Sequence, residues 1–378
     1  MMAFDDVKTE TATAAKPDRS THGNETYLAL VWRRLRRSFT GIVGLVLVAL
    51  LILIAVFADF FAPMNPLETN ASFSPPQVVS FFDKDGNLSL APRVYAIAET
   101  EELDPVTFQP IVGPDYDNPI YLGFFVKGAE YRLLGFIPMS RHFFGSTDGQ
   151  PVHFLGTDKF GRDVLSRAIY GSRISLAIAL SVVAIVTVIG TSVGLISGYF
   201  GGPLDAWVQR FVEVMLAFPQ LPLYFALTSL IPVTAPTTVF LVFVVGVMSA
   251  LGWAQMSREV RGKTLALARI DYVRAAIAVG ATDRRIIFQH ILPNVMSHVI
   301  VAVTLHIPSV VLLESFLGFL GFAVKPPLIS WGLMLQDTAT YSVIGSYPWI
   351  LAPVGFVLVT VFAFNALGDG LRDAVDPY

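Results

Sequence analysis

The sequence contains no cysteine and has few charged residues. Without cysteine the chain can form no disulfide, thiolate nucleophile or cysteine-ligated metal site. Charged residues make up 15% of the chain and hydrophobic residues 54%, whereas soluble domains carry about 25% charged residues. The net charge of −3 excludes a basic nucleic-acid binder, so we expect no nucleic-acid partner. This balance indicates an all-α membrane protein.

Six segments are long and apolar enough to cross a bilayer, which takes about 20 residues at a rise of about 1.5 Å each. The third is short and contains Pro219 and Pro222, and the fifth contains Pro308, so split spans are the main risk. The predicted spans are Gly41 to Phe61, Ile174 to Ser197, Ala217 to Val233, Thr237 to Gly252, Val295 to Leu313 and Trp349 to Leu367.

The distribution of basic residues predicts the orientation. Arg33, Arg34, Arg36 and Arg37 directly precede the first span, so the N-terminus is expected in the cytoplasm and, with six spans, the C-terminus as well. Residues 1–30 read as a disordered cytoplasmic tail and 31–64 as the first transmembrane helix. A second basic cluster lies on the predicted outer face, in a loop long enough to escape the charge rule: Lys159, Arg162, Arg167 and Arg173.

The segment 65–150 is too long for a simple connection. It contains aromatic and β-branched runs around Asp-Gly turn signals, such as VVSFF-DKDGN-LSL. We expect a small β-rich extracytoplasmic insert here, with an irregular loop as the alternative. Residues 151–378 then form a five-helix core.

The segment before the third span is amphipathic. Leu204, Trp207, Phe211 and Met215 recur at helical spacing, with Asp205 on another face. Two interpretations stay open: a helix along the inner interface that enters the membrane near Pro219, or a longer, tilted span.

A polar insert between the fourth and fifth spans is the most informative part of the chain. Leu265 to Val279 has no helix breaker and is expected to be helical; Gly280 ends the helix, and Thr282 can cap a second one. Two short helices meeting at a glycine would form a protruding knob for a cytoplasmic partner, although an ordinary charged loop fits composition equally well. With its approach the insert carries seven basic residues: Arg258, Arg261, Lys263, Arg269, Arg274, Arg284 and Arg285.

The predicted spans contain few ionisable residues. Asp59 and Glu314 fall near span ends, where they are expected to reach water, so no buried proton relay is predicted. His290, His298 and His306 are eight residues apart; packing or pore-lining polarity explains them better than a metal path, and no metal site or catalytic residue is expected.

Within the polar insert, Ala275, Ala276, Gly280, Leu292 and Pro293 match the spacing Glu-Ala-Ala, three residues, Gly, nine residues, Ile-x-Leu-Pro. Arg274 replaces the Glu and His290 the Ile. The chain therefore resembles the permease subunits of ATP-binding-cassette importers. Three further stretches resemble the C-type permease of the dipeptide/oligopeptide branch: LGTDKFGRDVLSRAIYGSRISL, ESFLGFLGFAVKPPLISWGLMLQD and LGDGLRDAVDP.

The resemblance implies the type I ABC importer permease fold in a bacterial inner membrane, and a permease for dipeptides, oligopeptides or similar compounds. It implies as partners a homologous B-type permease, two ATP-binding subunits, an extracytoplasmic substrate-binding protein and membrane lipid. No cofactor is expected on this chain, because ATP and Mg would bind the partner subunits. Coupling helices are implied at 264–291, with the coupling residues Asp271, Arg274, Ala275, Ala276, Gly280, Asp283, Arg284, His290, Leu292 and Pro293.

The stretch LGFLGFAVKPPLISWG contains too many glycines and prolines for a long helix. Non-helical backbone at the outer membrane edge must be buried in protein or face water. We consider two readings, an outer gate and a tight packing loop, for Gly318, Gly321, Pro326, Pro327 and Trp331. LGTDKFGRD is expected to cap the outer end of the second span. The rival function, a self-contained secondary carrier or channel, would need no ATP; a membrane hydrolase would need a nucleophile and base that the sequence lacks.

Overall fold

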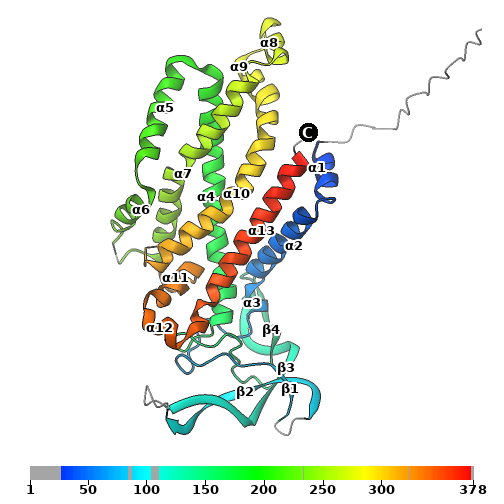
Figure 1. Ribbon diagram of the computed structural model, residues 1–378, viewed down its shortest axis with the longest axis vertical. Coiled ribbons are helices and arrows are strands. Elements are labelled where there is room, and N and C mark those ends of the chain that lie inside the picture. The colour runs from blue at the N-terminus through cyan, green and yellow to red at the C-terminus, as the bar shows by residue number, and fades with distance from the viewer. Residues whose placement is uncertain (1–26, 84–86, 104–109, 233, 323, 376–378) are drawn as a thin grey trace, which may run out of the picture.

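The computed structural model describes residues 27–375 apart from 84–86, 104–109, 233 and 323 (Figure 1). Long helices form a bundle, and the strands gather beyond one end of it. The segment α8–α9 lies at the opposite end, where the start of α1 (Tyr27–Leu35) and the end of α13 (Ala352–Val375) also lie. The predicted tail at 1–30 falls almost entirely outside the described residues.

Within the described residues, five helices are long and apolar enough to cross a membrane, and a bent pair makes a sixth candidate. This agrees with the predicted all-α membrane fold of six spans. The five are α2 (Phe39–Val56), α4 (Val164–Phe200), α7 (Thr237–Leu267), α10 (Leu292–Phe319, continuous with helical residues from Asp283) and α13.

The third span differs from the single helix predicted over Ala217 to Val233. It consists of α5 (Gly202–Ala217) and α6 (Gln220–Thr228), which are bent by 80° at Phe218 and Pro219. Proline lacks the amide hydrogen that a continuous helix needs, which accounts for the break. In Figure 1, α5 descends through the bundle beside α7, an arrangement that favours the longer-span interpretation over a helix lying along the interface.

The predicted β-rich insert is confirmed. It forms an antiparallel sheet in the order β1-β2-β3-β4, with strands β1 (Ser80–Phe82), β2 (Leu88–Leu103), β3 (Pro110–Leu133) and β4 (Ile137–Ser146). The first hairpin closes where the Asp-Gly signal predicts, because the Asn87 amide donates to the Asp83 carboxylate at 2.8 Å. Val94, Ile120, Leu122 and Val152 form its small apolar core.

The connecting elements are short. Between α2 and the sheet lies α3 (Ala58–Phe61). Between α7 and α10 lie α8 (Asp271–Ala278), α9 (Asp283–Arg285) and the π-helical turn η1 (Ile286–Ile291). Before α13 lie α11 (Trp331–Leu335), η2 (Gln336–Ala339), α12 (Tyr341–Ser346) and η3 (Pro348–Leu351).

Three glycines at intervals of four residues allow α4 and α7 to pack closely. Gly190, Gly194 and Gly198 lie on one face of α4 and meet α7 between Trp253 and Thr264. A Cβ atom on Gly194 would lie 2.6 Å from the Ser257 carbonyl oxygen. Small residues of this kind let transmembrane helices approach until their backbones touch, which maximises van der Waals contact in lipid.

This packing yields a test in which one substitution has opposite effects at two sites. Gly194→Ala should destabilise the protein by about 1–3 kcal/mol, because the new methyl overpacks the α4–α7 contact. Gly355→Ala in α13 meets open space, so only the helix-propensity gain of roughly 0.5–1 kcal/mol remains. Thermal unfolding of the solubilised protein measures both; equal midpoints for the two variants would contradict the packing argument.

Candidate functional site

The polar insert forms a small protrusion at the end of the bundle far from the strands (Figure 1). The predicted single helix over Leu265 to Val279 is wrong: α7 ends at Leu267, Ile270 is extended, and α8 begins at Asp271. The predicted second short helix is also not separate, because Asp283 begins a helical stretch that continues through η1 into α10. The knob therefore consists of one short helix, α8, and the free end of a long one.

Gly280 makes the turn between these helices, as predicted. Its φ is +83°, a conformation that glycine adopts without strain. The Gly280 amide donates to the Ile277 carbonyl at 2.9 Å and the Ala281 amide to the Ala276 carbonyl at 3.0 Å, the pattern of a Schellman cap. Thr282 occupies the predicted N-cap position, but its side chain makes no capping bond. Its carbonyl oxygen instead accepts from the Ile286 amide at 3.0 Å.

Apolar side chains on the inner surface hold the protrusion in place. Val273 of α8 is fully buried and packs in the same core cluster as Ile286 and Ile291. Tyr199, at the end of α4, donates its hydroxyl hydrogen to Asp283 at 2.7 Å. The position of the protrusion is thus set by α4 as well as by its neighbours in sequence.

The outer surface of the protrusion combines exposed apolar and basic side chains. Val279 is 86% exposed and Ile277 50%, beside exposed Arg274 and Arg284. Arg261 differs from the other six basic residues, because it is half-buried and pairs with Asp205 of α5 at 2.5 Å. An exposed apolar patch next to charge is typical of a protein-docking surface.

The structure brings the predicted coupling residues together on this protrusion. Asp271, Arg274, Ala275, Gly280, Asp283 and Arg284 are exposed, and Ala276, His290 and Leu292 are half-buried. Pro293 is exposed in the first turn of α10. Sequence reasoning missed Ile277 and Val279, two exposed apolar side chains next to the Gly280 turn.

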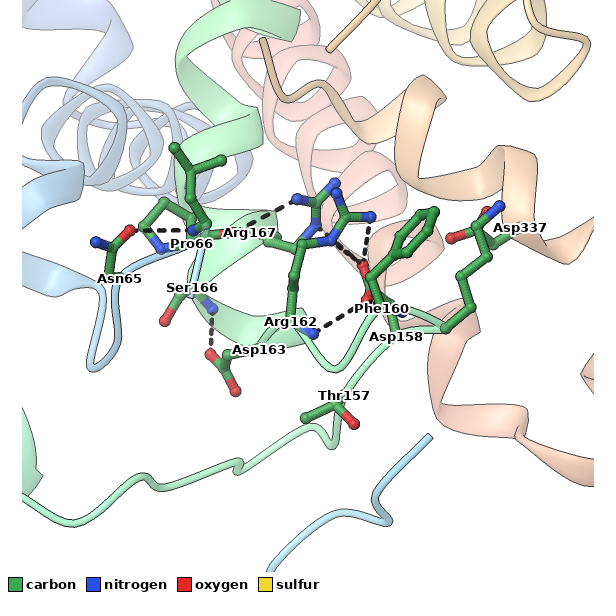
Figure 2. A network of polar contacts seen from close by, with 12 residues as sticks. Asn65, Pro66, Thr157, Asp158, Phe160, Arg162, Asp163, Ser166, Arg167 and Asp337 are labelled. Carbon is green, nitrogen blue, oxygen red and sulfur yellow. Dashed lines mark hydrogen bonds and ion pairs between the residues drawn. The ribbon is translucent and has the colours of Figure 1, made fainter. Parts of the chain in front are cut away.

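A buried ionic network lies at the other end of α4 (Figure 2). Asp158 accepts from the Arg162 side chain at 2.8 Å and lies 3.4 Å from the Arg167 guanidinium. Asp158 is 6% exposed and Arg167 4% exposed. The basic cluster that conflicts with the charge rule is therefore largely neutralised by pairing, since Lys159 pairs with Asp337 at 2.8 Å and Arg173 with Asp59 at 2.5 Å.

The same stretch caps the end of α4 nearest the sheet, in agreement with the predicted capping role. The Asp163 carboxylate accepts from the Ser166 amide at 2.7 Å and from His153 at 3.1 Å. Arg167 also donates to the Pro66 carbonyl at 3.4 Å, which ties the chain after α3 to α4. Through Lys159 and Asp337 the network reaches η2, so it connects three segments distant in sequence.

The glycine- and proline-rich loop after α10 is anchored by tight contacts. The helix includes Gly318 and ends at Phe319, and Gly321 follows with a φ of +82°. Trp331 begins α11 and is 0% exposed; its indole N–H donates to the Ala168 carbonyl at 2.8 Å. Gly318 packs against Gly332, and the Pro326-Pro327 bond is cis. At Trp331 this geometry favours the packing reading over the gate.

Glu314 does not reach water, contrary to the sequence expectation. It is 0% exposed in α10 and accepts from the Ser175 hydroxyl at 3.0 Å, and Ser175 in turn accepts from the Trp331 amide. The prediction that no buried ionisable group lies in the spans is therefore wrong, and it no longer argues against a proton-coupled carrier. The hydrogen bond from Ser175 nevertheless places Glu314 where α4, α10 and α11 meet, away from any open surface.

A second polar pair joins α7 and α10. The His298 imidazole lies 3.7 Å from the Glu259 carboxylate, and both side chains are about one-third exposed. Gln255 donates to the same carboxylate at 2.9 Å. The sequence alone did not indicate a carboxylate partner for His298, whereas the structure places Glu259 of α7 beside it. Among the described residues, no three His, Asp or Glu side chains converge on a metal position.

Asp59, at the membrane edge, keeps its negative charge despite its surroundings. Burial raises the pKa of its carboxyl, but hydrogen bonds from Arg173 and Tyr170 outweigh burial and hold the pKa below its usual value. The Tyr170 hydroxyl donates to Asp59 at 2.6 Å. The Asp59 carboxylate thus remains ionised at neutral pH, and its bonds to Arg173 and Tyr170 fix α3 against α4.

Comparison with known families agrees with this geometry. Residues 190–378 match the profile of "Binding-protein-dependent transport system inner membrane component", and residues 26–76 match "N-terminal TM domain of oligopeptide transport permease C". The chain belongs to the family of binding-protein-dependent transport system inner membrane components. This family consists of transport permeases, which are membrane subunits and not enzymes.

Several curated permeases of this family resemble the chain. The oligopeptide transport system permease protein of Haemophilus influenzae is 42% identical over 226 residues, covering 60% of this chain and 70% of the relative. The dipeptide permease of Bacillus subtilis is 38% identical over 225 residues, covering 60% and 68%. The glutathione permease of Pectobacterium atrosepticum is 37% identical over 226 residues, covering 60% and 73%.

The two family profiles leave residues 77–189 unmatched. All four strands fall in that interval, as does the ionic network around Asp158. The sheet is therefore an addition to the matched permease segments, and it contacts them where Phe125 of β3 and Phe143 of β4 pack against Phe60 of α3.

The ionic network predicts a large effect from one carboxylate. Asp158→Asn leaves Arg167 buried without its anionic partner, which should cost about 3–5 kcal/mol. Asp337→Asn breaks the pair with the exposed Lys159 and removes an electrostatic interaction with Arg167 that is weaker than that of Asp158, so it should cost less than about 1 kcal/mol. Thermal unfolding midpoints distinguish the two; a loss no greater for Asp158→Asn than for Asp337→Asn would refute the structural role of the network.

Proposed function

We propose that this chain is the permease subunit of an ATP-driven, binding-protein-dependent importer of peptides or peptide-like compounds. Family membership supports the binding-protein-dependent part of the proposal. The relatives are named as oligopeptide, dipeptide and glutathione transport permeases, and these three substrates are all peptide-like. Because these relatives are named for different peptide-like compounds, we propose this class as the substrate and no single compound within it.

The coupling surface supports the ATP-driven part. The surface consists of α8, the Gly280 turn and the start of the helix at Asp283. Its exposed Ile277 and Val279 would fill an apolar groove on an ATP-binding subunit, and the surrounding arginines would face acidic side chains there. ATP and Mg would bind two such partner subunits, and this chain would hold no cofactor.

The orientation follows from the same surface. The arginines before α2 and those of the coupling surface lie at one end of the bundle, together with the end of α13 (Figure 1). That end would face the cytoplasm, so both termini would be cytoplasmic. The sheet would then lie outside, where a substrate-binding protein docks.

The translocation path would run between this chain and a homologous B-type permease. Ionisable groups that remain partly exposed within membrane helices face a water-filled cavity or another protein. Glu259 and His298 meet that description on α7 and α10. We infer that this face of the bundle lines the path, which opens alternately to either side as the ATP-binding subunits close and separate.

A large side chain at Gly280 tests the coupling assignment. Gly280→Trp projects an indole from the docking surface and should reduce uptake roughly tenfold or more, a loss of about 1.4 kcal/mol in coupling. ATP hydrolysis by the reconstituted complex should persist without matching uptake. Gly149→Trp is the matched control, since its φ of +71° is also positive and its surroundings are also open, but it lies at the sheet end. Normal uptake by Gly280→Trp would show that the coupling surface is wrongly placed.

A thiol-reactivity experiment tests the path assignment, aided by the absence of native cysteine. Glu259→Cys in the assembled transporter should react with a membrane-impermeant charged reagent, and the product should block uptake. Val188→Cys, on an exposed apolar face of α4, should stay unreactive because hydrocarbon suppresses the thiolate. If the Glu259→Cys variant is unreactive and the Val188→Cys variant reacts, the face with Glu259 does not line the path and the face with Val188 is open to water.

A further inference from the structure

A cavity of about 580 Å³ opens sideways where the sheet meets the transmembrane helices. Its walls come from α2, α4 and the hairpin that joins β3 to β4. Most of the side chains that line the cavity are apolar, among them Ile52, Leu176, Leu180 and Leu134. The charged side chains in the lining include Arg132 and Arg173.

The cavity lies at membrane depth. Ile52 precedes the end of α2 by four residues, so it lies about 6 Å inside that end of the span. Leu180 lies seven residues beyond Arg173 on α4, about 10 Å farther along the helix. Because Leu134 lines the same cavity as these two residues, the hairpin tip lies next to the part of α2 and α4 that crosses the apolar layer of the bilayer.

The tip of this hairpin is built for contact with an apolar phase. Phe136 is 71% exposed and Leu134 48% exposed, and neither is covered by the sheet. Gly135 closes the turn with its amide donating to the Arg132 carbonyl at 3.0 Å. Apolar side chains concentrated at a rigid turn beside transmembrane helices continue the lipid-facing surface of those helices.

The charges at the rim match a phosphate. The Arg173 guanidinium donates to Asp59 and to the Ala55 and Val56 carbonyls at the end of α2. Arg132 is exposed at the cavity rim, so Arg132 and Arg173 against Asp59 leave one net positive charge there. An exposed guanidinium above an apolar floor is the arrangement that a phospholipid headgroup and acyl chain require.

We propose that this cavity binds a phospholipid from the leaflet nearest the sheet. The acyl chain lies along Ile52, Leu176 and Leu180, the phosphate lies beside Arg132, and Leu134 and Phe136 enter the leaflet. The sheet is thereby fixed to the membrane surface as well as to α3. This inference requires only the membrane-spanning fold and is independent of the proposed substrate.

The absence of native cysteine permits a direct test of depth. Leu134→Cys and Phe136→Cys, each carrying an environment-sensitive fluorophore, are examined in the complete transporter in nanodiscs of phosphatidylethanolamine and phosphatidylglycerol. Both should emit at shorter wavelength than the control Leu90→Cys, whose native side chain is 93% exposed on β2. Lipids carrying a quencher near the headgroup should quench the tip variants and leave the control unchanged.

The arginine is tested by lipid retention. Arg132→Gln should retain about fivefold less phosphatidylglycerol in native mass spectra of the complex, whereas Arg132→Lys should retain nearly the wild-type amount because the charge remains. Peptide uptake need not change in either variant.

Two results would overturn the proposal. Fluorophores at 134 and 136 that behave like the one at 90 would place the tip in water. A blue shift without lipid quenching, together with cross-linking of the Leu134→Cys variant to the second permease, would show that a protein covers the cavity instead.

Discussion

The backbone contact between α4 and α7 fixes the position of α4, and α4 in turn positions the polar structures at both ends of the bundle. Gly190, Gly194 and Gly198 remove the side chains that would hold the two helices apart, so their interface is set by van der Waals contact and not by polar bonds. In the hydrocarbon of a bilayer, apolar helices gain nothing from the hydrophobic effect when they associate. Their association is therefore driven by van der Waals packing, which requires a close fit. The far ends of α4 then carry the two polar structures, the network at Asp158 and the contact of Tyr199 with Asp283.

The two ends of the bundle use charge differently. At the sheet end, carboxylates neutralise the basic cluster, and burial makes Asp158 and Arg167 dependent on each other. At the opposite end, the arginines of the coupling surface remain exposed, whereas Arg261 of the adjoining helix α7 pairs with Asp205. Paired charges fix structure, and exposed charges beside Ile277 and Val279 leave a surface suited to a partner.

Hydropathy was enough to predict six spans, β-branched runs around an Asp-Gly signal predicted the β-rich insert, and a glycine after a helical stretch predicted the turn at Gly280. They failed where tertiary contacts decide. The break at Ala268–Ile270 has no proline or glycine to signal it, and Glu314 is buried because Ser175 and Trp331 surround it from distant segments. The partnership of Glu259 with His298 likewise depends on how α7 meets α10. The four-residue glycine spacing in α4 was readable from the sequence and was overlooked.

The unbroken helical course from Asp283 to Phe319 has a mechanical consequence. One end of this rod stands in the coupling surface, and Gly318, near the other, touches Gly332 of α11 backbone to backbone. Pro308 lies inside α10, and the π-helical turn η1 lies near the Asp283 end, so the helix can bend at two points between the protrusion and the glycine contact. A single continuous helix nevertheless connects the two ends of the bundle, with one flexible point near each of the structures that it joins.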